Sequence, residues 1–275
     1  MPELPEVETI VQGLKPHLQD ATIKQVTIRT PQLRWPIPAL NGLLKHQTIR
    51  QITRRGKYLL FELPQGTLLI HLGMSGRLCL LPHETPPQRH DHVDLLLTDG
   101  RVVRYTDPRR FGAILWTNAC PLQHPLLKDL GVEPLTEAFT EAYLLQQTAK
   151  RRRAIKPLIM DSKIVVGIGN IYAAESLFLA GIHPAMPAGL LTKTQAARLV
   201  PAIKQILERA IAQGGTTLKD FVNGDGRPGY FAQQLEVYGR AGLPCNVCGE
   251  PLKSHVLGQR STVFCEQCQK MHKEP

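Results

Sequence analysis

Two Cys-x2-Cys motifs near the C-terminal end constrain this chain most strongly: Cys245–Cys248 and Cys265–Cys268, with 16 residues between them. Motifs at this separation supply four thiolates for a tetrahedral Zn²⁺ ion, and metal binding stabilises a segment too short to build its own core. Disulfides or free thiols are the alternative. The N-terminal residues are acidic, where a signal peptide would be basic and then apolar, so we expect a cytoplasmic chain and favour zinc.

The residues between the two motifs predict a β-ribbon. Its strands are expected at 256–257 and 262–264, and its tip at 258–261. A zinc ion closed by four cysteines has no open position for catalysis. Arg260, at the tip, is therefore the ribbon residue that we expect to touch a ligand.

The first part of the chain alternates short apolar runs with turn residues, which is typical of an antiparallel β-sandwich or barrel. Asp99-Gly100 predicts a type I′ hairpin, and the stretch 82–91 predicts a loop. The expected strands are 22–29, 49–54, 58–63, 67–72, 77–81, 93–98, 101–105 and 113–117.

Helical patterns surround this β-rich part. An opening helix is expected from about Pro5, with Val7 and Ile10 on its apolar face. After about residue 133, further helices are expected at 137–147, 154–161, 171–180 and 192–213, with glycine stops at 181 and 214. The Gly-rich stretch 223–229 predicts a loop.

The charge balance indicates a polyanionic partner. The chain has 33 Lys and Arg against 23 Asp and Glu, a formal net charge of +10. The cations form three clusters, which fit phosphate contacts but also fit solvated surface. The clusters are Arg50, Arg54, Arg55 and Lys57; Arg101, Arg104, Arg109 and Arg110; and residues 150–153 with Lys156.

Pro2 is the first candidate for chemistry. Removal of Met1 would make it a free secondary amine, with the carboxylate of Glu3 beside it. An α-amino group has a pKa of roughly 7.7–8.0, so part of it is nucleophilic near neutral pH and able to form a Schiff base. The alternative is structural, because prolines and acids also suit the first turn of a helix.

Three weaker motifs fit contacts with nucleic acid. Asn170 follows two glycines at an expected helix start, where it could cap the helix with or without a bound phosphate. Met74, in the loop 71–76, could wedge between base steps or pack inward. Arg109 and Phe111 combine a cation with an aromatic ring that could stack on a base.

His90-Asp91-His92 could be read as a metal pair, but no third ligand is evident nearby. We expect His90 to contact phosphate and His92 to be structural. The remaining cysteines, Cys79 and Cys120, are expected to be structural as well.

Taken together, these segments resemble bacterial formamidopyrimidine-DNA glycosylase. The resemblance rests on Met-Pro-Glu-Leu-Pro-Glu-Val-Glu-Thr at 1–9, on the segments 55–60, 71–76, 105–112, 167–175 and 214–221, and on the four-cysteine ribbon. The related endonuclease VIII usually lacks Leu4 and the Val7-Glu8-Thr9 form of the opening. The oxidised-purine branch is therefore favoured over the oxidised-pyrimidine branch.

The resemblance implies an α+β protein with three parts. An N-terminal antiparallel β-sandwich with flanking helices would span 1–132, a helical domain with a helix–two-turn–helix motif and a lesion-capping loop 133–232, and a zinc ribbon 233–275. The expected partner is double-stranded DNA with oxidised bases or abasic sites. The chain is expected to be a monomer and to need no membrane. It would remove 8-oxoguanine and formamidopyrimidines and then cut the abasic strand.

The resemblance also implies roles for individual residues. Pro2 would be the Schiff-base nucleophile, Glu3 its acid/base, Lys57 the cation for β-elimination and Arg260 the cation for δ-elimination. Asn170, His90, Arg109 and Arg151 would contact DNA, and Met74, Arg109 and Phe111 would fill the gap left by the extruded nucleotide. The lesion would be read within 216–231, by backbone amides of 218–221.

Two hypotheses of other classes stay open at this point. The ribbon and the net charge alone would fit a non-catalytic zinc-ribbon DNA-binding protein. His90-Asp91-His92 would fit a metal-dependent nuclease.

Overall fold

The computed structural model describes residues 2–215 and 234–271. The chain divides into two compact units, one formed by 1–129 with 213–232 and the other by 130–212 with 233–275. The expected α+β class is confirmed. The stretch 216–231, where lesion reading was expected, lies outside the described residues.

Helix α1 (Leu4–Leu18) opens the N-terminal unit and starts one residue before the expected Pro5. Glu3 is its N-cap and shares a reciprocal capping box with Glu6, in which the Glu3 N–H donates to Glu6 Oε2 at 2.8 Å. Pro5 suits the first turn, since the first N–H groups of a helix have no intrahelical partner. One face is buried along the whole helix: Leu4, Val7, Ile10, Val11, Leu14 and Leu18.

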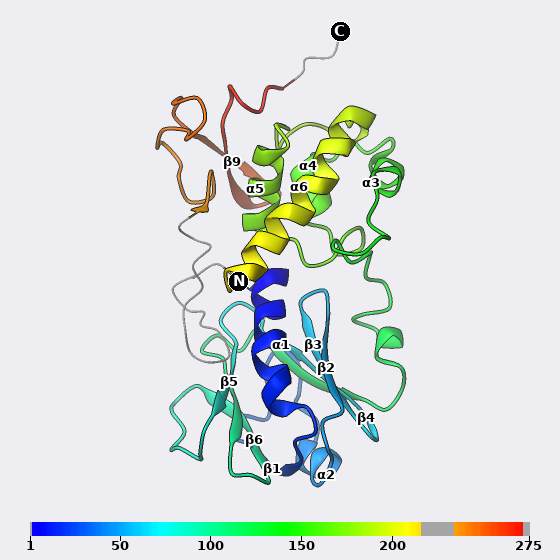
Figure 1. Ribbon diagram of the computed structural model, residues 1–275, viewed down its shortest axis with the longest axis vertical. Coiled ribbons are helices and arrows are strands. Elements are labelled where there is room, and N and C mark those ends of the chain that lie inside the picture. The colour runs from blue at the N-terminus through cyan, green and yellow to red at the C-terminus, as the bar shows by residue number, and fades with distance from the viewer. Residues whose placement is uncertain (1, 216–233, 272–275) are drawn as a thin grey trace. The chain divides into compact units, whose positions relative to one another are not determined.

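Two four-stranded antiparallel sheets form the expected sandwich (Figure 1). The first has the order β2-β3-β4-β8, with β2 (Gln51–Arg55), β3 (Tyr58–Leu63), β4 (Gly66–His71) and β8 (Ala113–Thr117). The second has the order β1-β6-β7-β5, with β1 (Ile23–Ile28), β6 (Asp91–Leu97), β7 (Val102–Thr106) and β5 (Arg77–Leu81). A short helix α2 (Leu40–Leu44), which the sequence pattern did not predict, follows β1.

One apolar core joins both sheets to helix α1. It takes Ile10 and Leu14 from α1, Phe61 from the first sheet, and Val93 and Val103 from the second. Helix α1 therefore has a fixed place within the N-terminal unit, and the buried residues Pro2 and Glu3 directly precede it.

The hairpin between β6 and β7 forms where Asp99-Gly100 predicts it, but the type I′ prediction was wrong. A type I′ turn needs positive φ at both central residues. Gly100 has a φ of +90°, whereas Asp99 is not among the residues with positive φ. The Gly100 N–H donates to Leu97 O at 3.1 Å, and Asp99 instead pairs with Arg101.

Four α-helices and a ribbon build the described part of the C-terminal unit: α3 (Glu141–Thr148), α4 (Ile155–Ile159), α5 (Asn170–Leu179), α6 (Lys193–Ala212), and the paired strands β9 (Lys253–Leu257) and β10 (Arg260–Phe264). Helix α3 starts four residues after the expected 137, because Thr140 caps it by accepting the Tyr143 N–H at 3.1 Å. Helix α5 packs against α6 and against β10.

A small apolar cluster holds the ribbon to helix α5. Phe178 of α5 packs with Val237, Leu252 and Val263, and with Cys245 and Cys265. The carboxylate of Glu175, also on α5, accepts the backbone N–H groups of residues 236, 237 and 238 at 2.8–3.0 Å. The chain that leads into the ribbon is therefore fixed to α5 before the first cysteine is reached.

None of the helices in the described ranges, 2–215 and 234–271, has the length and apolar character needed to cross a membrane.

Shortening a side chain on the buried face of α1 should weaken the N-terminal unit. We expect Leu14→Ala to lower the free energy of unfolding by about 2–5 kcal/mol, because a fully buried side chain leaves a cavity. Gln12→Ala, on the exposed face of the same helix, should change it by less than about 0.5 kcal/mol. Urea unfolding followed by circular dichroism measures both, and equal effects would contradict the placement of α1.

Candidate catalytic and nucleic-acid-binding sites

Pro2 and Glu3 lie at the buried start of α1. Pro2 is buried, and the Glu3 and Glu6 side chains are only 2% and 1% exposed. Gly215 lies against Glu6: with its φ of +80°, a Cβ added there would come 3.1 Å from Glu6 Oε1. The positive end of the helix favours carboxylates at this position. An amine at residue 2 would thus have two carboxylates on the first turn beside it.

Lys57 is half-buried in the turn between β2 and β3, which Gly56 forms with a φ of +57°. Arg54 ties this turn to helix α1. Its Nε donates to Glu8 Oε2 at 2.8 Å, and its Nη1 donates to Gly56 O at 2.9 Å. The position of Lys57 is therefore coupled to that of α1.

His71, at the end of β4, is a site residue to which the sequence assigned no role. Removal from water, with the charges of Lys57 and Arg34, lowers the pKa of His71 to about 4. Its Nδ1 accepts the Gly73 N–H at 3.0 Å, so the neutral ring carries its proton on Nε2. The ring packs on Tyr58, its cross-strand neighbour, at 4.7 Å. His71 thus offers a neutral donor near Lys57.

Two loops bring Met74, Arg109 and Phe111 together. Gly73 has a φ of +61°, and a Cβ there would lie 2.4 Å from the Phe111 carbonyl carbon, so the loops 72–76 and 107–112 touch. Arg109 Cζ lies 4.8 Å from the centre of the Phe111 ring, which is 47% exposed. Met74 is half-buried and Arg109 is exposed.

The loop 107–112 borders a hollow of about 520 Å³. Its lining residues are Gln32, Leu33, Arg34, Arg109, Arg110 and Phe111. The Arg34 N–H donates to Gly112 O at 3.1 Å, which fixes the bend 32–36, closed by a bridge between Gln32 and Pro36, beside the loop 107–112. Three arginines around an exposed aromatic ring favour an anionic ligand with stacking faces.

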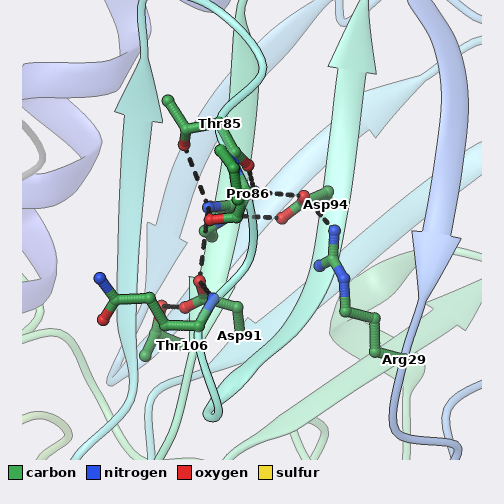
Figure 2. A network of polar contacts seen from close by, with 8 residues as sticks. Arg29, Thr85, Pro86, Asp91, Asp94 and Thr106 are labelled. Carbon is green, nitrogen blue, oxygen red and sulfur yellow. Dashed lines mark hydrogen bonds and ion pairs between the residues drawn. The ribbon is translucent and has the colours of Figure 1, made fainter.

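His90 is half-exposed at the end of the loop 82–90, which a buried polar network fixes to β6 and β7 (Figure 2). Arg104 is at its centre: its Nη2 donates to Thr85 O at 2.8 Å, and its guanidinium holds Asp94 in two hydrogen bonds of 2.7 and 2.8 Å. Asp94 also accepts from Arg29 at 2.6 Å. Burial alone would raise the pKa of Asp94, but the two arginines lower it.

The same network speaks against a metal at His90-Asp91-His92. Asp91 accepts from Thr106 Oγ1 at 2.5 Å and from the Gln88 N–H at 2.8 Å. Both ring nitrogens of His92 are engaged, Nδ1 with Thr30 Oγ1 and Nε2 with Asp107 O. Within the part of the chain that the structure describes, only the four ribbon cysteines form a group of metal ligands. The structural role expected for His92 agrees with these contacts.

Asn170 is the first residue of α5 and not its N-cap, so that expectation was wrong. Gly169 is the N-cap. The Asn170 side chain instead accepts from Lys156 Nζ at 2.5 Å and donates to Ser261 O at 3.0 Å. Lys156, only 1% exposed, also donates to Thr262 Oγ1 at 2.7 Å. This contact joins α5 to strand β10, and the sequence pattern gave no sign of it.

Arg260 and Arg151 are both exposed cations of the C-terminal unit. Arg260 begins β10, paired with Leu257, so the tip consists of Gly258 and Gln259 and is shorter than expected. Arg151 lies beside η2 (Ala188–Leu190), because its carbonyl accepts the Gly189 N–H at 2.8 Å.

The four cysteines meet the geometric requirement for zinc. Their Sγ atoms all lie within 4.8 Å of one another, with Cys245–Cys268 at 3.9 Å and Cys248–Cys265 at 3.4 Å. Tetrahedral Zn²⁺ with bonds of about 2.3 Å places its sulfur ligands about 3.8 Å apart. The Cys268 N–H also approaches Cys265 Sγ at 3.5 Å, which favours a thiolate. The cluster fits one structural zinc ion with no open position.

The chain contains, in order, a β-sandwich, a helical unit and a four-cysteine ribbon. Three family models match in order: "Formamidopyrimidine-DNA glycosylase N-terminal domain" over 1–114, "Formamidopyrimidine-DNA glycosylase H2TH domain" over 130–222, and "Zinc finger found in FPG and IleRS" over 242–270. The chain belongs to the formamidopyrimidine-DNA glycosylase (Fpg, MutM) family, whose members act in base excision repair.

Relatives match along the whole chain. The formamidopyrimidine-DNA glycosylase of Escherichia coli O6:K15:H31 is 55% identical over 270 residues, covering 98% of this chain and 100% of the relative. The solved MutM (Fpg) protein of Thermus thermophilus is 38% identical, with a TM-score of 0.88 over 99% of this chain and all of that one. A Lactococcus lactis Fpg mutant, solved with Fapy-dG-containing DNA, is 34% identical, with a TM-score of 0.90 over 98% of this chain and all of that one.

Zinc content tests the cysteine cluster. We expect about one zinc ion per chain by atomic absorption, and loss of one ligand in Cys265→Ser should release it and lower the thermal stability of the C-terminal unit. Cys120→Ser is the matched control, because Cys120 is exposed and outside the cluster. Full zinc content in Cys265→Ser would contradict the assignment.

Acidification should remove stability through His71. Its pKa is about 4 in the folded chain against an ordinary 6.5, so between these values the unfolded chain binds more protons. The free energy of unfolding therefore falls as the pH drops from 6.5 toward 4. Relative to His71→Asn, which keeps an acceptor but cannot titrate, the wild type should lose at most about 1.4 kcal/mol per pH unit. Urea unfolding between pH 4.5 and 7 measures this, and a constant difference would contradict the low pKa.

Proposed function

We propose that this chain excises oxidised purines, such as 8-oxoguanine and formamidopyrimidines, from double-stranded DNA and then cuts the abasic strand. The observation that carries the proposal is the pairing of Pro2 with Glu3 at the buried, positively polarised start of α1. Membership of the family supports the substrate class. The mechanism requires that Met1 be removed.

The first step replaces one bond at the sugar by another. A base inside a duplex must be extruded before its glycosidic bond can be reached. The Pro2 nitrogen then attacks C1′, the C1′–N bond to the damaged base breaks, and the base leaves. Glu3 handles the proton transfers at the sugar, since positive charge builds up there as the bond breaks. This exchange leaves C1′ bonded to both the Pro2 nitrogen and the ring oxygen O4′. The C1′–O4′ bond then breaks, O4′ takes a proton, and the nitrogen lone pair forms the iminium between Pro2 and C1′.

The later steps break the strand on both sides of the sugar. The iminium makes a C2′ proton acidic; its loss expels the 3′ phosphate by β-elimination, and a second elimination expels the 5′ phosphate. Cations at the phosphates lower the barriers to both. Lys57 is proposed for the first elimination and Arg260 for the second. Binding of an abasic strand is supported by a relative, since an L. lactis Fpg was solved with abasic-site-containing DNA.

The remaining site residues are proposed to bind and deform the duplex. His90, Arg151 and Asn170 would contact phosphates. Met74, Arg109 and Phe111 would fill the gap left by the extruded nucleotide, and the stacking of Arg109 on Phe111 supports such a unit.

Tight binding of damaged duplex DNA without incision of the strand would indicate a DNA-binding module in place of an enzyme.

Borohydride trapping tests the Pro2 nucleophile. The chain is made with a short N-terminal extension that a protease removes to leave Pro2 as the first residue. On duplex DNA with 8-oxoguanine, the cut form should give a covalent adduct, and the uncut form should give at least about 100-fold less, because the amine is then an amide. The two forms share every other residue and so form a matched pair.

Glu3→Gln separates the two activities of the cut form. Its rate of base excision should fall by about 100-fold or more, the range of general acid–base catalysis, while it should still be trapped on a preformed abasic site.

In the trapping experiment, full trapping by the uncut form would rule out Pro2 as the nucleophile and assign that role to Lys57.

A further inference from the structure

Asp107 is a fully buried carboxylate to which neither the sequence nor the proposed mechanism assigns a role. It follows β7 and stands at the base of the loop 107–112. Its Oδ1 accepts from Ser75 Oγ at 2.7 Å, and its Oδ2 accepts from the Gly112 N–H at 2.9 Å and from the Tyr105 hydroxyl at 3.2 Å. One side chain therefore receives a donor from each of two loops and from one strand.

Hydrogen bonds, and not an ion pair, compensate the burial of the Asp107 carboxylate. Among the residues that the structure describes, no cation forms an ion pair with it. A buried carboxylate that loses a donor is strongly penalised, so the donors are held in place as firmly as the acceptor. Burial, and then the charge of Asp107, raises the pKa of Tyr105 well above its ordinary value, so Tyr105 remains a donor.

The network continues from Asp107 to the gap-filling residues. Ser75 Oγ, which donates to Asp107, also accepts the Arg109 N–H at 3.2 Å. The Asp107 carbonyl accepts the Arg110 N–H at 3.2 Å, which holds Arg110 at a φ of +55°. Positive φ is unfavourable for a residue with a side chain, so this conformation needs an external restraint.

Each gap-filling residue is a direct neighbour of a restrained position. Met74 lies between Gly73 and Ser75, and Phe111 lies between Arg110 and Gly112. Gly112 has no room for a side chain, because a Cβ there would lie 1.8 Å from the Tyr105 hydroxyl. The loops 72–76 and 107–112 can therefore shift relative to each other only if the bonds to Asp107 break.

We propose that Asp107 is a positioning residue that fixes Met74, Arg109 and Phe111 as one unit for entry into the duplex, with Ser75 as the link between the two loops. The inference rests on the proposed function. A preassembled unit enters the stack without ordering each side chain separately, so it assists base extrusion more than any later step.

The test compares two substrates of the same duplex sequence, one with 8-oxoguanine and one with a preformed abasic site, under single-turnover conditions. An abasic site has no base to extrude. We expect Ser75→Ala to slow excision of 8-oxoguanine by about 10–100-fold, the effect of losing a hydrogen bond to a charged group, and to slow abasic-strand cleavage by less than about 3-fold. Asp107→Asn should act in the same direction.

Tyr105→Phe is the matched control. It removes a donor from the same carboxylate, but this donor belongs to strand β7 and not to a loop. The ratio of the 8-oxoguanine excision rate to the abasic-strand cleavage rate should therefore stay within about 3-fold of wild type. With 2-aminopurine beside the lesion, the fluorescence rise on unstacking should be slowed in Ser75→Ala and not in Tyr105→Phe. Ser75→Ala carries the test even if Asp107→Asn does not fold.

An unchanged ratio in Ser75→Ala, or equal slowing on both substrates, would overturn the positioning role while wild-type excision still supports the proposed function. A shift in the ratio in Tyr105→Phe as large as in Ser75→Ala would overturn it too, because the effect would then be general destabilisation. A wild-type chain that excises no base would overturn the proposed function and this inference with it.

Discussion

The burial of helix α1 in the N-terminal unit is the interaction on which the candidate chemistry depends. An α-amine occurs only at the end of a chain, where residues are usually poorly ordered. Here the face with Ile10 and Leu14 shares one core with both sheets, and the Glu3–Glu6 capping box closes the first turn. Pro2, next to the N-cap Glu3, is thereby buried, and Arg54 ties the turn of Lys57 to the same helix.

Buried polar groups then order the loops, which lack an apolar core of their own. Arg104 fixes the loop that leads to His90, and Asp107 joins the loops of Met74 and Phe111. Both are satisfied by several partners, which makes the arrangement specific, since a partly satisfied network would be destabilising. The exposed side chains at the loop ends can therefore keep a defined geometry before any ligand binds.

The ribbon of the C-terminal unit is stabilised by a four-cysteine site together with a small apolar cluster. Four cysteines close the site, and helix α5 provides the surface against which the ribbon packs. Two side chains of α5 hold this part of the chain: the Glu175 carboxylate binds the segment that leads into the ribbon, and Asn170 binds strand β10. Burial raises the pKa of Glu175 while the three backbone donors oppose this rise, so the anchor combines desolvation with directed hydrogen bonds.

Local patterns in the sequence determined the zinc ligands, the β-sandwich with its strands to within a few residues, the amphipathic face of α1 and the Pro2-Glu3 pair, because spacing and periodicity are properties of neighbouring residues. Only the tertiary structure decided the low pKa of His71, the role of Asn170 as a link to β10, and the partners of Asp107. Ser75 lies 32 positions before Asp107, and Ser261 lies 91 positions after Asn170. Such contacts depend on how the chain folds back on itself, which no local pattern records.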